Sequence, residues 1–411
     1  MNLPFFIARR YLVKQKGTFS SFIIKIAIVA TALSVAVMIL SAAVITGFKT
    51  TITEKLFAFN GHVHLETYDP TNSNSLTLKP LSVDNRLISE IKKIPHVQQV
   101  FPFTQRPTII QVHNQIEGIQ LKGIDKDFHF LKGITLTGKQ IDFTDSAYAK
   151  QIILSQTTAN RLSVAVGDTV QLNFIEAGSA LPRIRRVTVA GIYHSGMEEI
   201  DKSFGICDTR LLQRINNWQA NNINGYQINL ENEKYSDTVA NYIISNLVSN
   251  SSGITAYTIP DLYAGIYDWL SITNTNSMIL LVIMGIVAII NMATVLLIVM
   301  VDRTTMIGIL KSLGMSYGGT RNIFLYIAAL VGIAGTLGGN LLALVLCWIQ
   351  TKYGIIQMNE DTYYMKYAPV KIIWWQVGLI DVVTLLLCVL CMWLPTLYIR
   401  RIQPAKVLQF K

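Results

Sequence analysis

The sequence predicts an α-helical membrane protein with four transmembrane helices, arranged as one plus three, and a large mixed α/β domain inserted between the first helix and the second. The 411 residues are 51% hydrophobic and only 15% charged, which is typical of membrane proteins. Four apolar stretches are long enough, at about 1.5 Å of helical rise per residue, to cross about 30 Å of hydrocarbon. The polar segment of about 220 residues between the first two is large enough for a folded domain.

The limits of the predicted segments follow from where the apolar stretches begin and end. Helical patterning continues past the first span to residue 59, and it starts before the second span, near Tyr267. The predicted order is an amphipathic N-terminal segment at 1–20, a first transmembrane helix at 21–48, a two-lobed α/β domain at 49–270, a second transmembrane helix at 271–301, a short helix and loop at 302–321, a third transmembrane helix at 322–350, a loop at 351–371, a fourth transmembrane helix at 372–399 and a tail at 400–411.

The excess positive charge lies beside the apolar stretches and not on the inserted domain. Residues 49–270 hold 20 Lys and Arg against 21 Asp and Glu, whereas the rest of the chain holds 15 against 4. Twelve of those 15 basic residues fall on one predicted side of the membrane. The positive-inside rule therefore puts both termini and the 302–321 loop in the cytoplasm and the inserted domain outside. The same distribution argues against a nucleic-acid partner.

Patterns within the inserted domain predict a mixed α/β fold. Apolar alternation indicates strands, and apolar spacing of three and four residues indicates helices. Because Pro182 interrupts the pattern, residues 175–183 are expected to form a protruding connection between two strands. The predicted elements are a helix at 84–94 capped near Ser82, strands at 97–103, 108–112 and 115–123, a strand and helix at 152–154 and 156–162, strands at 169–174 and 184–193, and a strand and helix at 226–230 and 235–248.

A two-faced helix is predicted in the short interruption between the second and third spans. Gly314 follows it and supplies a left-handed stop. A helix of this kind at the membrane surface is suited to receive a push from a soluble partner. Its apolar side carries Met306, Ile307, Ile309, Leu310 and Leu313, and its other side carries Thr304, Thr305, Gly308, Lys311 and Ser312.

No catalytic or nucleotide-binding pattern is found in the sequence. The patterns GxxxxGK[ST], GxSxG, HExxH and paired CxxC do not occur, so we expect no catalytic residue, no metal and no cofactor in this chain. His62 and His64 share one face of a strand, where a solvated face is a simpler interpretation than a metal site without a third ligand. His194 and Ser195 are adjacent, which does not make a nucleophile–base pair.

Two features inside the predicted spans leave alternatives open. Asp381 is the only acid within a span, and it either couples to protons or is a hydrogen-bonded or snorkelled residue near the outer leaflet. Gly335 and Gly339 are four residues apart, which either allows close contact between helices or reflects the ordinary enrichment of glycine in membrane helices.

An apolar groove open to the outer leaflet is a further hypothesis, with ordinary packing or lipid contact as the alternative. Such a groove would lie between the first and second spans. Its predicted lining is Met38, Ile39, Leu40, Val44, Ile45, Phe48, Ile272, Met278, Leu281 and Val282.

Several stretches together carry a family resemblance that covers essentially the whole chain. They are residues 8–12 (ARRYL), 47–48 (GF), 121–125 (LKGID), 166–168 (VGD), 191–201 (GIYHSGMEEID), 302–314 (DRTTMIGILKSLG), 369–370 (PV) and 404–408 (PAKVL). In these stretches the sequence resembles permeases of the FtsX-like superfamily, and more closely the lipoprotein-releasing ABC transporter permeases of the LolC/LolE type. The family's coupling motif has a Glu where this chain has Met306. An ionic contact at that position is therefore in doubt.

This resemblance implies a multi-pass protein of the bacterial inner membrane, with a MacB-like periplasmic domain and cytoplasmic termini. It implies two copies of a cytoplasmic ABC ATPase that hold ATP and Mg²⁺, a second permease subunit, identical or different, a lipoprotein substrate and a periplasmic carrier. The coupling helix would present Arg303, Thr304, Met306, Ile307, Ile309, Leu310, Lys311 and Leu313. The loop that contacts the carrier would include Ile175, Glu176, Ala177, Gly178, Leu181, Pro182 and Arg183.

Three functions remain as hypotheses. The first is extraction of lipoproteins from the outer leaflet, driven by the separate ATPase. The second is mechanotransmission, in which ATP hydrolysis acts on a periplasmic partner and no substrate moves. The third is a membrane-anchored sensor or enzyme. The long insert and the 175–183 connection favour the first, while the missing catalytic pattern argues against the third.

Overall fold

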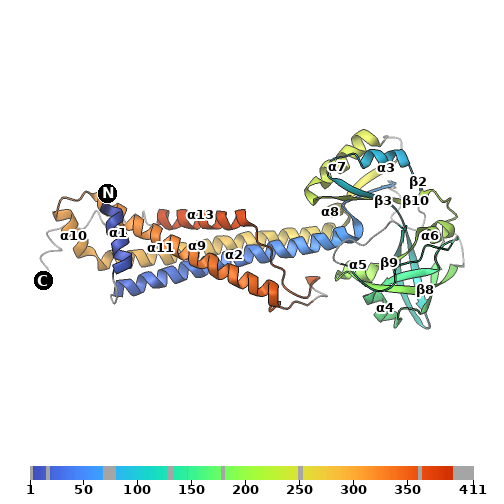
Figure 1. The fold of residues 1–411 in the computed structure, drawn as a ribbon, viewed down its shortest axis with the longest axis horizontal. Helices are drawn as coiled ribbons and strands as arrows, with labels where there is room; N and C mark the ends of the chain where they lie inside the picture. Colours follow the sequence, from blue (N-terminus) through green and yellow to red (C-terminus); the bar gives the residue numbers. More distant parts are fainter. Residues whose placement is uncertain are drawn as a thin grey trace. The chain divides into compact units, whose positions relative to one another are not determined.

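The computed structural model describes residues 3–14, 19–67, 80–126, 134–145, 147–176, 181–248, 253–359 and 363–391, and the chain divides into two compact units (Figure 1). The helical unit comprises Met1–Lys49, Trp269–Gln357 and Tyr367–Lys411. The α/β unit comprises Thr50–Asp268 and Met358–Lys366. The segment Met358–Lys366 lies between two apolar helices in sequence, yet it packs as part of the α/β unit, which the sequence did not indicate.

The helical unit contains long apolar helices that match the predicted spans. Three of the described helices are long and apolar enough to cross a membrane, and α13 is a shorter apolar helix. The predicted fourth span continues to residue 399, and its residues 392–399 lie outside the described part. The helices are α1 (Leu3–Lys14), α2 (Phe19–Asn60), α9 (Ala264–Asp302), α10 (Thr304–Ser312), α11 (Tyr317–Tyr353) and α13 (Trp374–Cys391).

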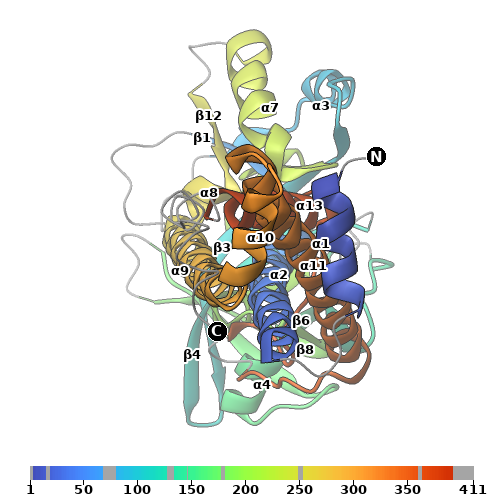
Figure 2. The ribbon, with the colours of Figure 1, turned by 90° about the vertical axis from the view of Figure 1, so that its left-hand side faces the viewer.

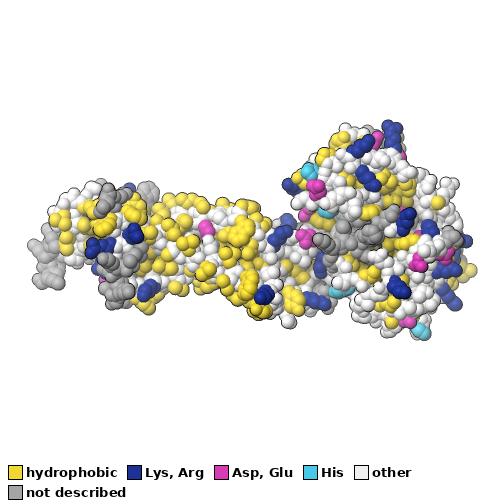
Figure 3. Space-filling view, in the orientation of Figure 1, with side chains coloured by type: hydrophobic (Ala, Val, Ile, Leu, Met, Phe, Trp, Pro, Cys, Tyr) yellow, Lys and Arg dark blue, Asp and Glu magenta, His cyan; other side chains and the backbone are white. Residues whose placement is uncertain are grey.

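The expected extensions of the first two spans are confirmed. α2 continues as one helix of 42 residues to Asn60, and α9 begins at Ala264. Apolar side chains are spread over the visible face of the helical unit in Figure 3, where few charged side chains appear along its middle. An apolar outer surface of this size fits a lipid environment, because in water it would drive association.

Close contact between α2 and α11 confirms the first interpretation of the glycine pair. A Cβ added at Gly335 would lie 2.7 Å from Thr31 Cβ, and one added at Gly339 would lie 2.7 Å from the Ala32 carbonyl oxygen. Both distances are too short for real atoms, so only glycine lets the two helix backbones approach this closely.

Asp381 is hydrogen-bonded, as the second interpretation of this residue expected. Asn340 of α11 donates from Nδ2 to Asp381 Oδ2 of α13 at 2.7 Å. A polar side chain inside apolar surroundings is costly unless it finds such a partner. This contact therefore fastens α13 to α11.

The α/β unit is built on a ten-stranded mixed sheet. Its order is β12-β1-β11-β3-β4-β9-β6-β8-β5, and β7 pairs with β3 and β8. A separate two-stranded sheet pairs β10 with β2. The strands are β1 (Val63–Thr67), β2 (Leu81–Ser82), β3 (Val97–Val112), β4 (Gln115–Ile124), β5 (Thr135–Gly138), β6 (Gln151–Ser155), β7 (Thr169–Phe174), β8 (Arg183–His194), β9 (Phe204–Asp208), β10 (Asn222–Ile223), β11 (Gly225–Leu230) and β12 (Ile254–Thr258).

Two hydrophobic cores divide the α/β unit into two lobes. The sequence predicted two lobes but not the boundary between them. One core includes Leu121, Leu154 and Val189, and the other includes Leu65, Ile91 and Ile228. β3 bridges them, because its first half pairs with β11 and its second half with β4. The helices that pack on the sheet or close it are α3 (Asn85–Ile91), α4 (Gln156–Leu162), α5 (Glu198–Ser203), α6 (Thr209–Ile215), the 3-10 helix η1 (Glu233–Tyr235), α7 (Ser236–Tyr242), the π-helix η2 (Ile243–Leu247) and α8 (Ile259–Leu262).

Some predicted elements were wrong in detail. Strands 97–103 and 108–112 form one continuous strand, β3, since residues 104–107 keep pairing with β4. The helix α3 is capped by Asp84, whose side chain accepts from the Arg86 and Leu87 amides, and not by Ser82. The helix expected at 235–248 is split into η1, α7 and η2.

His62 and His64 are buried, so the solvated strand face predicted for them is wrong. Leu230 N donates to His62 Nδ1 at 3.1 Å, and His64 Nε2 lies 2.6 Å from the Asn60 carbonyl oxygen. Burial lowers the pKa of His62 to about 4. Both rings are therefore part of the folded interior, where strand alternation alone did not place them.

Candidate functional site: a surface helix and a hairpin loop

The helix α10 is anchored to the helical unit by one fully buried side chain. Ile307 packs into a core that includes Val299 of α9 and Phe324 of α11, with Leu310 partly buried against it. Figure 2 looks toward this end of the helical unit, with α10 in front. The helix thus rests on the ends of the long helices and does not stand free of them.

The predicted apolar side of α10 is split between two directions. Ile307 faces the core, whereas Leu313 is 78% exposed and Ile309 is 45% exposed. Met306 and Leu310 are half-buried. Arg303 pairs with Asp302 at 3.3 Å. The apolar surface that remains exposed here consists of Ile309, Leu313 and part of Met306, which is smaller than the face that the sequence indicated.

A Schellman motif ends α10 and fixes the direction of the chain beyond it. Gly314 has φ 88°, so the expected left-handed stop is confirmed. Gly314 N donates to the Lys311 carbonyl at 3.1 Å, and Met315 N donates to the Leu310 carbonyl at 3.0 Å. These two bonds satisfy carbonyls that a helix end otherwise leaves unpaired. The exposed Leu313 is thereby held on a defined turn.

The 175–183 loop is the connection of a β-hairpin between β7 and β8. Phe174 pairs with Arg183 across the hairpin. Leu181 is 78% exposed, and Ile175 and Ile184 are also exposed. Of the predicted carrier residues, Ala177 and Gly178 lie outside the described part. The described ends of the loop present apolar side chains to solvent.

Two arginines clamp the base of this loop to the end of α6. Arg183 Nε lies 2.8 Å from Glu176 Oε1, and its Nη1 donates to the Ile215 carbonyl at 2.6 Å. Arg106 of β3 donates to the Ile175 carbonyl at 3.1 Å and to the Asn216 side chain. Burial lowers the pKa of Arg106. Carbonyls at a helix C-terminus attract cations, so the clamp gives the loop a fixed base.

Sequence patterns missed Arg106. It is 69 residues from Ile175 in the chain, and it falls in the gap between the strands predicted at 97–103 and 108–112. The continuous β3 is what carries it to the loop.

The residues predicted to line an apolar groove fall into two groups. Met38, Ile39 and Phe48 are buried within the helical unit. Leu281 packs on the core that holds Met38 and Ile39, and Phe48 meets Trp269 at 5.3 Å between ring centres. The outward group comprises Ile272, Met278 and Val282, which are exposed on α9, while Val44 and Ile45 are half-buried.

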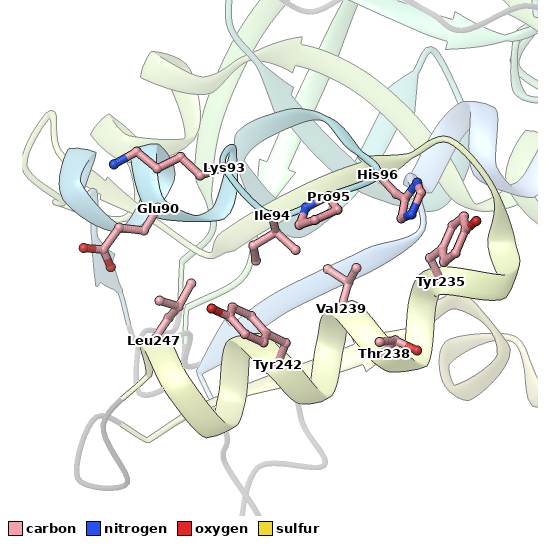
Figure 4. A pocket seen from close by; sticks show the side chains of 10 residues that line it. All are labelled: Glu90, Lys93, Ile94, Pro95, His96, Tyr235, Thr238, Val239, Tyr242 and Leu247. Carbon is pink, nitrogen blue, oxygen red and sulfur yellow. The ribbon is translucent and has the colours of Figure 1, made fainter.

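A groove of about 420 Å³ lies in the α/β unit between α3 and α7 (Figure 4). Ile94, Val239 and Leu247 point into it, and the His96 ring stacks on Tyr235 at 3.7 Å between ring centres. Its walls are mainly apolar side chains, and none of the predicted site residues is among them.

His194 and Ser195 are arranged around an acid and not toward each other. Ser195 Oγ donates to Asp201 Oδ1 at 2.7 Å, and His194 Nδ1 lies 3.2 Å from Asp201 Oδ2. A serine nucleophile needs the histidine between it and the acid. Here Asp201 stands between them, so the group fastens β8 to α5.

Comparison with known families shows two matches that together span most of the chain. A model of the MacB-like periplasmic core domain matches residues 26–245, and a model of the FtsX-like permease C-terminal domain matches residues 278–404. The first match covers more than half of the chain.

Full-length relatives are also found. The chain is 25% identical to the lipoprotein-releasing system transmembrane protein LolC of Xylella fastidiosa strain Temecula1, over 98% of each chain. It is 23% identical to the protein of the same name from Neisseria meningitidis over 100% of each chain, and 23% identical to LolE of Haemophilus influenzae over 99% of each. The periplasmic region of MacB from Actinobacillus actinomycetemcomitans aligns with a TM-score of 0.35 and 14% identity, over 51% of this chain and 94% of that one.

The two family matches cover successive parts of the chain that the structure also distinguishes. The first match runs from α2 through the α/β unit, and the second begins in α9 and continues through α10, α11 and α13. The chain therefore belongs to the family of membrane permeases that join a MacB-like periplasmic core domain to an FtsX-like permease C-terminal domain.

Proposed function

We propose that this chain is a permease subunit of a lipoprotein-releasing ABC transporter in the bacterial inner membrane. It works with a cytoplasmic ATPase, a second permease subunit and a periplasmic lipoprotein carrier. The observation that carries the proposal is α10, a helix anchored by Ile307 that exposes Ile309 and Leu313. An apolar surface of this kind, held on a fixed turn, suits contact with a soluble subunit.

The energetics require a partner that supplies work. Extracting a lipid anchor from a bilayer costs about 0.8 kcal/mol per CH₂ group, so a multiply acylated protein does not leave unaided. The sequence has no GxxxxGK[ST] pattern. ATP hydrolysis therefore belongs to the ATPase subunit, and α10 is the contact through which that subunit moves this chain.

The hairpin loop supports a contact with the carrier on the opposite side of the membrane. Its exposed Leu181, Ile175 and Ile184 offer apolar surface, and the Arg106 and Arg183 clamp holds their base in place. Preorganised loops bind with less loss of conformational entropy.

The exposed face of α9 supports pairing with a second permease subunit. Ile272, Met278 and Val282 face outward from the chain, while Met38, Ile39 and Phe48 lie inside it. A lipoprotein cavity would then form between α9 and the partner subunit. This arrangement differs from the predicted groove, in which all the lining residues of the first and second spans face one cavity within a single chain.

Two leucines of equal exposure allow a matched test of the proposal. Leu313 and Leu181 are both 78% exposed, the first at the C-cap of α10 and the second on the hairpin loop. We expect Leu313→Asp to abolish co-purification with the ATPase, because it puts a charge into an apolar contact. We expect Leu181→Asp to keep the ATPase bound and to reduce transfer of labelled lipoprotein to the carrier.

The wild-type complex, in membranes with ATP and carrier, is the reference for release. If both variants bind the ATPase equally, the role of α10 is wrong. If the wild type hydrolyses ATP and releases no lipoprotein, extraction is wrong and mechanotransmission is the function to pursue.

A further inference from the structure

The C-terminal end of α2 is held inside the α/β unit by a buried lysine. Lys122 of β4 is fully buried. Its ammonium donates to the Phe59 carbonyl at 2.6 Å and to Gln227 Oε1 at 2.7 Å, and it lies 4.7 Å from the centre of the Phe59 ring. Phe59 is in the last turn of α2, where carbonyls lack helical partners and carry the negative end of the helix dipole. The cation therefore lies where the helix end attracts it.

The same ammonium connects strands that contribute to the two cores of the α/β unit. Lys122 follows Leu121, which belongs to one core, and Gln227 precedes Ile228, which belongs to the other. The strands that carry them, β4 and β11, flank β3 in the sheet. One side chain thus joins α2 to a strand from each core.

A histidine and a glycine complete the helix end. His64 Nε2 lies 2.6 Å from the Asn60 carbonyl oxygen, and His64 Nδ1 lies 3.1 Å from Glu66. Gly61 has φ 74°, and its amide donates to the Phe57 carbonyl at 2.8 Å. The carbonyls of Phe59 and Asn60 thus have side-chain partners from the sheet, and the Phe57 carbonyl is paired with the Gly61 amide, so the end of the helix is held in place.

Stability alone gives no reason for a lysine at this position. Burial lowers the pKa of Lys122 to about 7, against an opposing effect of the Glu66 carboxylate. A buried charged group is costly, and apolar side chains of similar volume often replace such groups without loss of stability. What methionine could not supply is the directed pair of bonds to Phe59 and Gln227.

We propose that Lys122 is a positioning residue that fixes the C-terminal end of α2 to both cores of the α/β unit, so that movement of the helix reaches the two cores together. The inference rests on the proposed function, in which the ATPase acts on this chain at α10. α2 is a single helix of 42 residues, each of which adds about 1.5 Å to its length. Because the helix is unbroken, a displacement at one end is passed to the other.

The first test uses the purified full-length chain alone and measures amide hydrogen exchange. We expect Lys122→Met to raise exchange about tenfold or more in residues 57–62, because an unfastened helix end opens more often. β6 and β8, two and three strands away from β4 in the strand order, should keep wild-type exchange. Unchanged exchange at 57–62, or an equal rise throughout the unit, would overturn the proposal.

A milder variant keeps the test decisive if Lys122→Met fails to fold. Gln227→Met removes the β11 acceptor and leaves the contact between Lys122 and Phe59. We expect faster exchange in β11, with residues 57–62 still protected. Faster exchange in residues 57–62 with β11 still protected would contradict the proposed connection through Lys122. Lys150→Met, at an exposed lysine of the same unit, is the matched control and should match the wild type in both regions.

The second test uses the complex with its ATPase and counts lipoproteins released per ATP hydrolysed. We expect Lys122→Met to keep ATP hydrolysis and to lower this ratio several-fold, since the helix still moves but the domain no longer follows. A ratio equal to that of the wild type would show that Lys122 only stabilises the fold, and would overturn the proposal. If the wild-type complex releases nothing, the proposed function fails, and the exchange measurement decides the role of Lys122 by itself.

Discussion

At the scale of single residues, this protein places polar side chains inside where they join elements that are distant in sequence. His62 bonds the Leu230 amide, Asn340 bonds Asp381, and Lys122 bonds Phe59. Each contact satisfies a group that would be costly to bury alone. Polar residues at these positions therefore report on tertiary contacts and not on exposure.

The buried His62 predicts a dependence of stability on pH. Its pKa is about 4 in the folded protein and 6.5 ordinarily. Between these values the unfolded chain binds a proton that the folded chain does not, so the free energy of unfolding declines as the pH falls from 6.5 to 4. We expect this residue to contribute about 1–3 kcal/mol of that decline.

Denaturant unfolding at pH 7 and pH 4.5 measures this contribution when wild type and His62→Asn are compared. Asparagine can still accept from the Leu230 amide, but it does not titrate. The difference in stability between the two pH values should be smaller in the variant. An equal difference in both proteins would show that His62 does not contribute.

At the scale of elements, glycine spacing and helix ends decide how the helices pack. Gly335 and Gly339 bring α11 against α2, and the Schellman motif after α10 fixes the turn that leads into α11. Ile307 seats α10 on the helices it connects. These contacts make α10 part of the helical unit.

The contact between α11 and α2 predicts a specific packing defect. Gly339→Ala would place a methyl group 2.7 Å from the Ala32 carbonyl oxygen, and backbone cannot move aside as a flexible side chain can. We expect a loss of about 1–3 kcal/mol, as for other overpacked interiors. Unfolding of the detergent-solubilised chain measures it.

Gly378→Ala is the control, because a Cβ there meets nothing within 4 Å. Its stability should equal that of the wild type or exceed it slightly, since alanine favours helix. Equal stability of both variants would show that α2 and α11 separate without cost.

At the scale of the whole molecule, the chain returns to its α/β unit after crossing the helical unit. Tyr364 donates its hydroxyl to Glu199, and Lys55 of α2 donates to the Tyr364 carbonyl at 2.6 Å and to the Gly196 carbonyl at 3.2 Å. Burial, together with Glu199, raises the pKa of Tyr364. Residues 55, 196–199 and 364 thus form one contact from three separate parts of the sequence.

Removing the Tyr364 hydroxyl is predicted to loosen this returning segment. Tyr364→Phe leaves the partly buried Glu199 carboxylate without that donor, which costs about 1 kcal/mol. Amide exchange in residues 363–366 should rise, while exchange in residues 340–350 of α11 stays constant. Tyr353→Phe, at an exposed position of α11, should change neither. A uniform rise along both segments would contradict this assignment.

The sequence by itself determined the apolar helices, the α/β class of the insert, the 169–174 strand and the left-handed stop at Gly314, because these depend on local periodicity and on backbone chemistry. Tertiary structure decided that residues 97–112 form one strand, that His62 and His64 are buried, and that Ile307 and Leu313 face in different directions. The physical reason is that periodicity says which residues are apolar but not what lies opposite them. A buried lysine or histidine has the same sequence pattern as an exposed one until its partner, tens of residues away, folds against it.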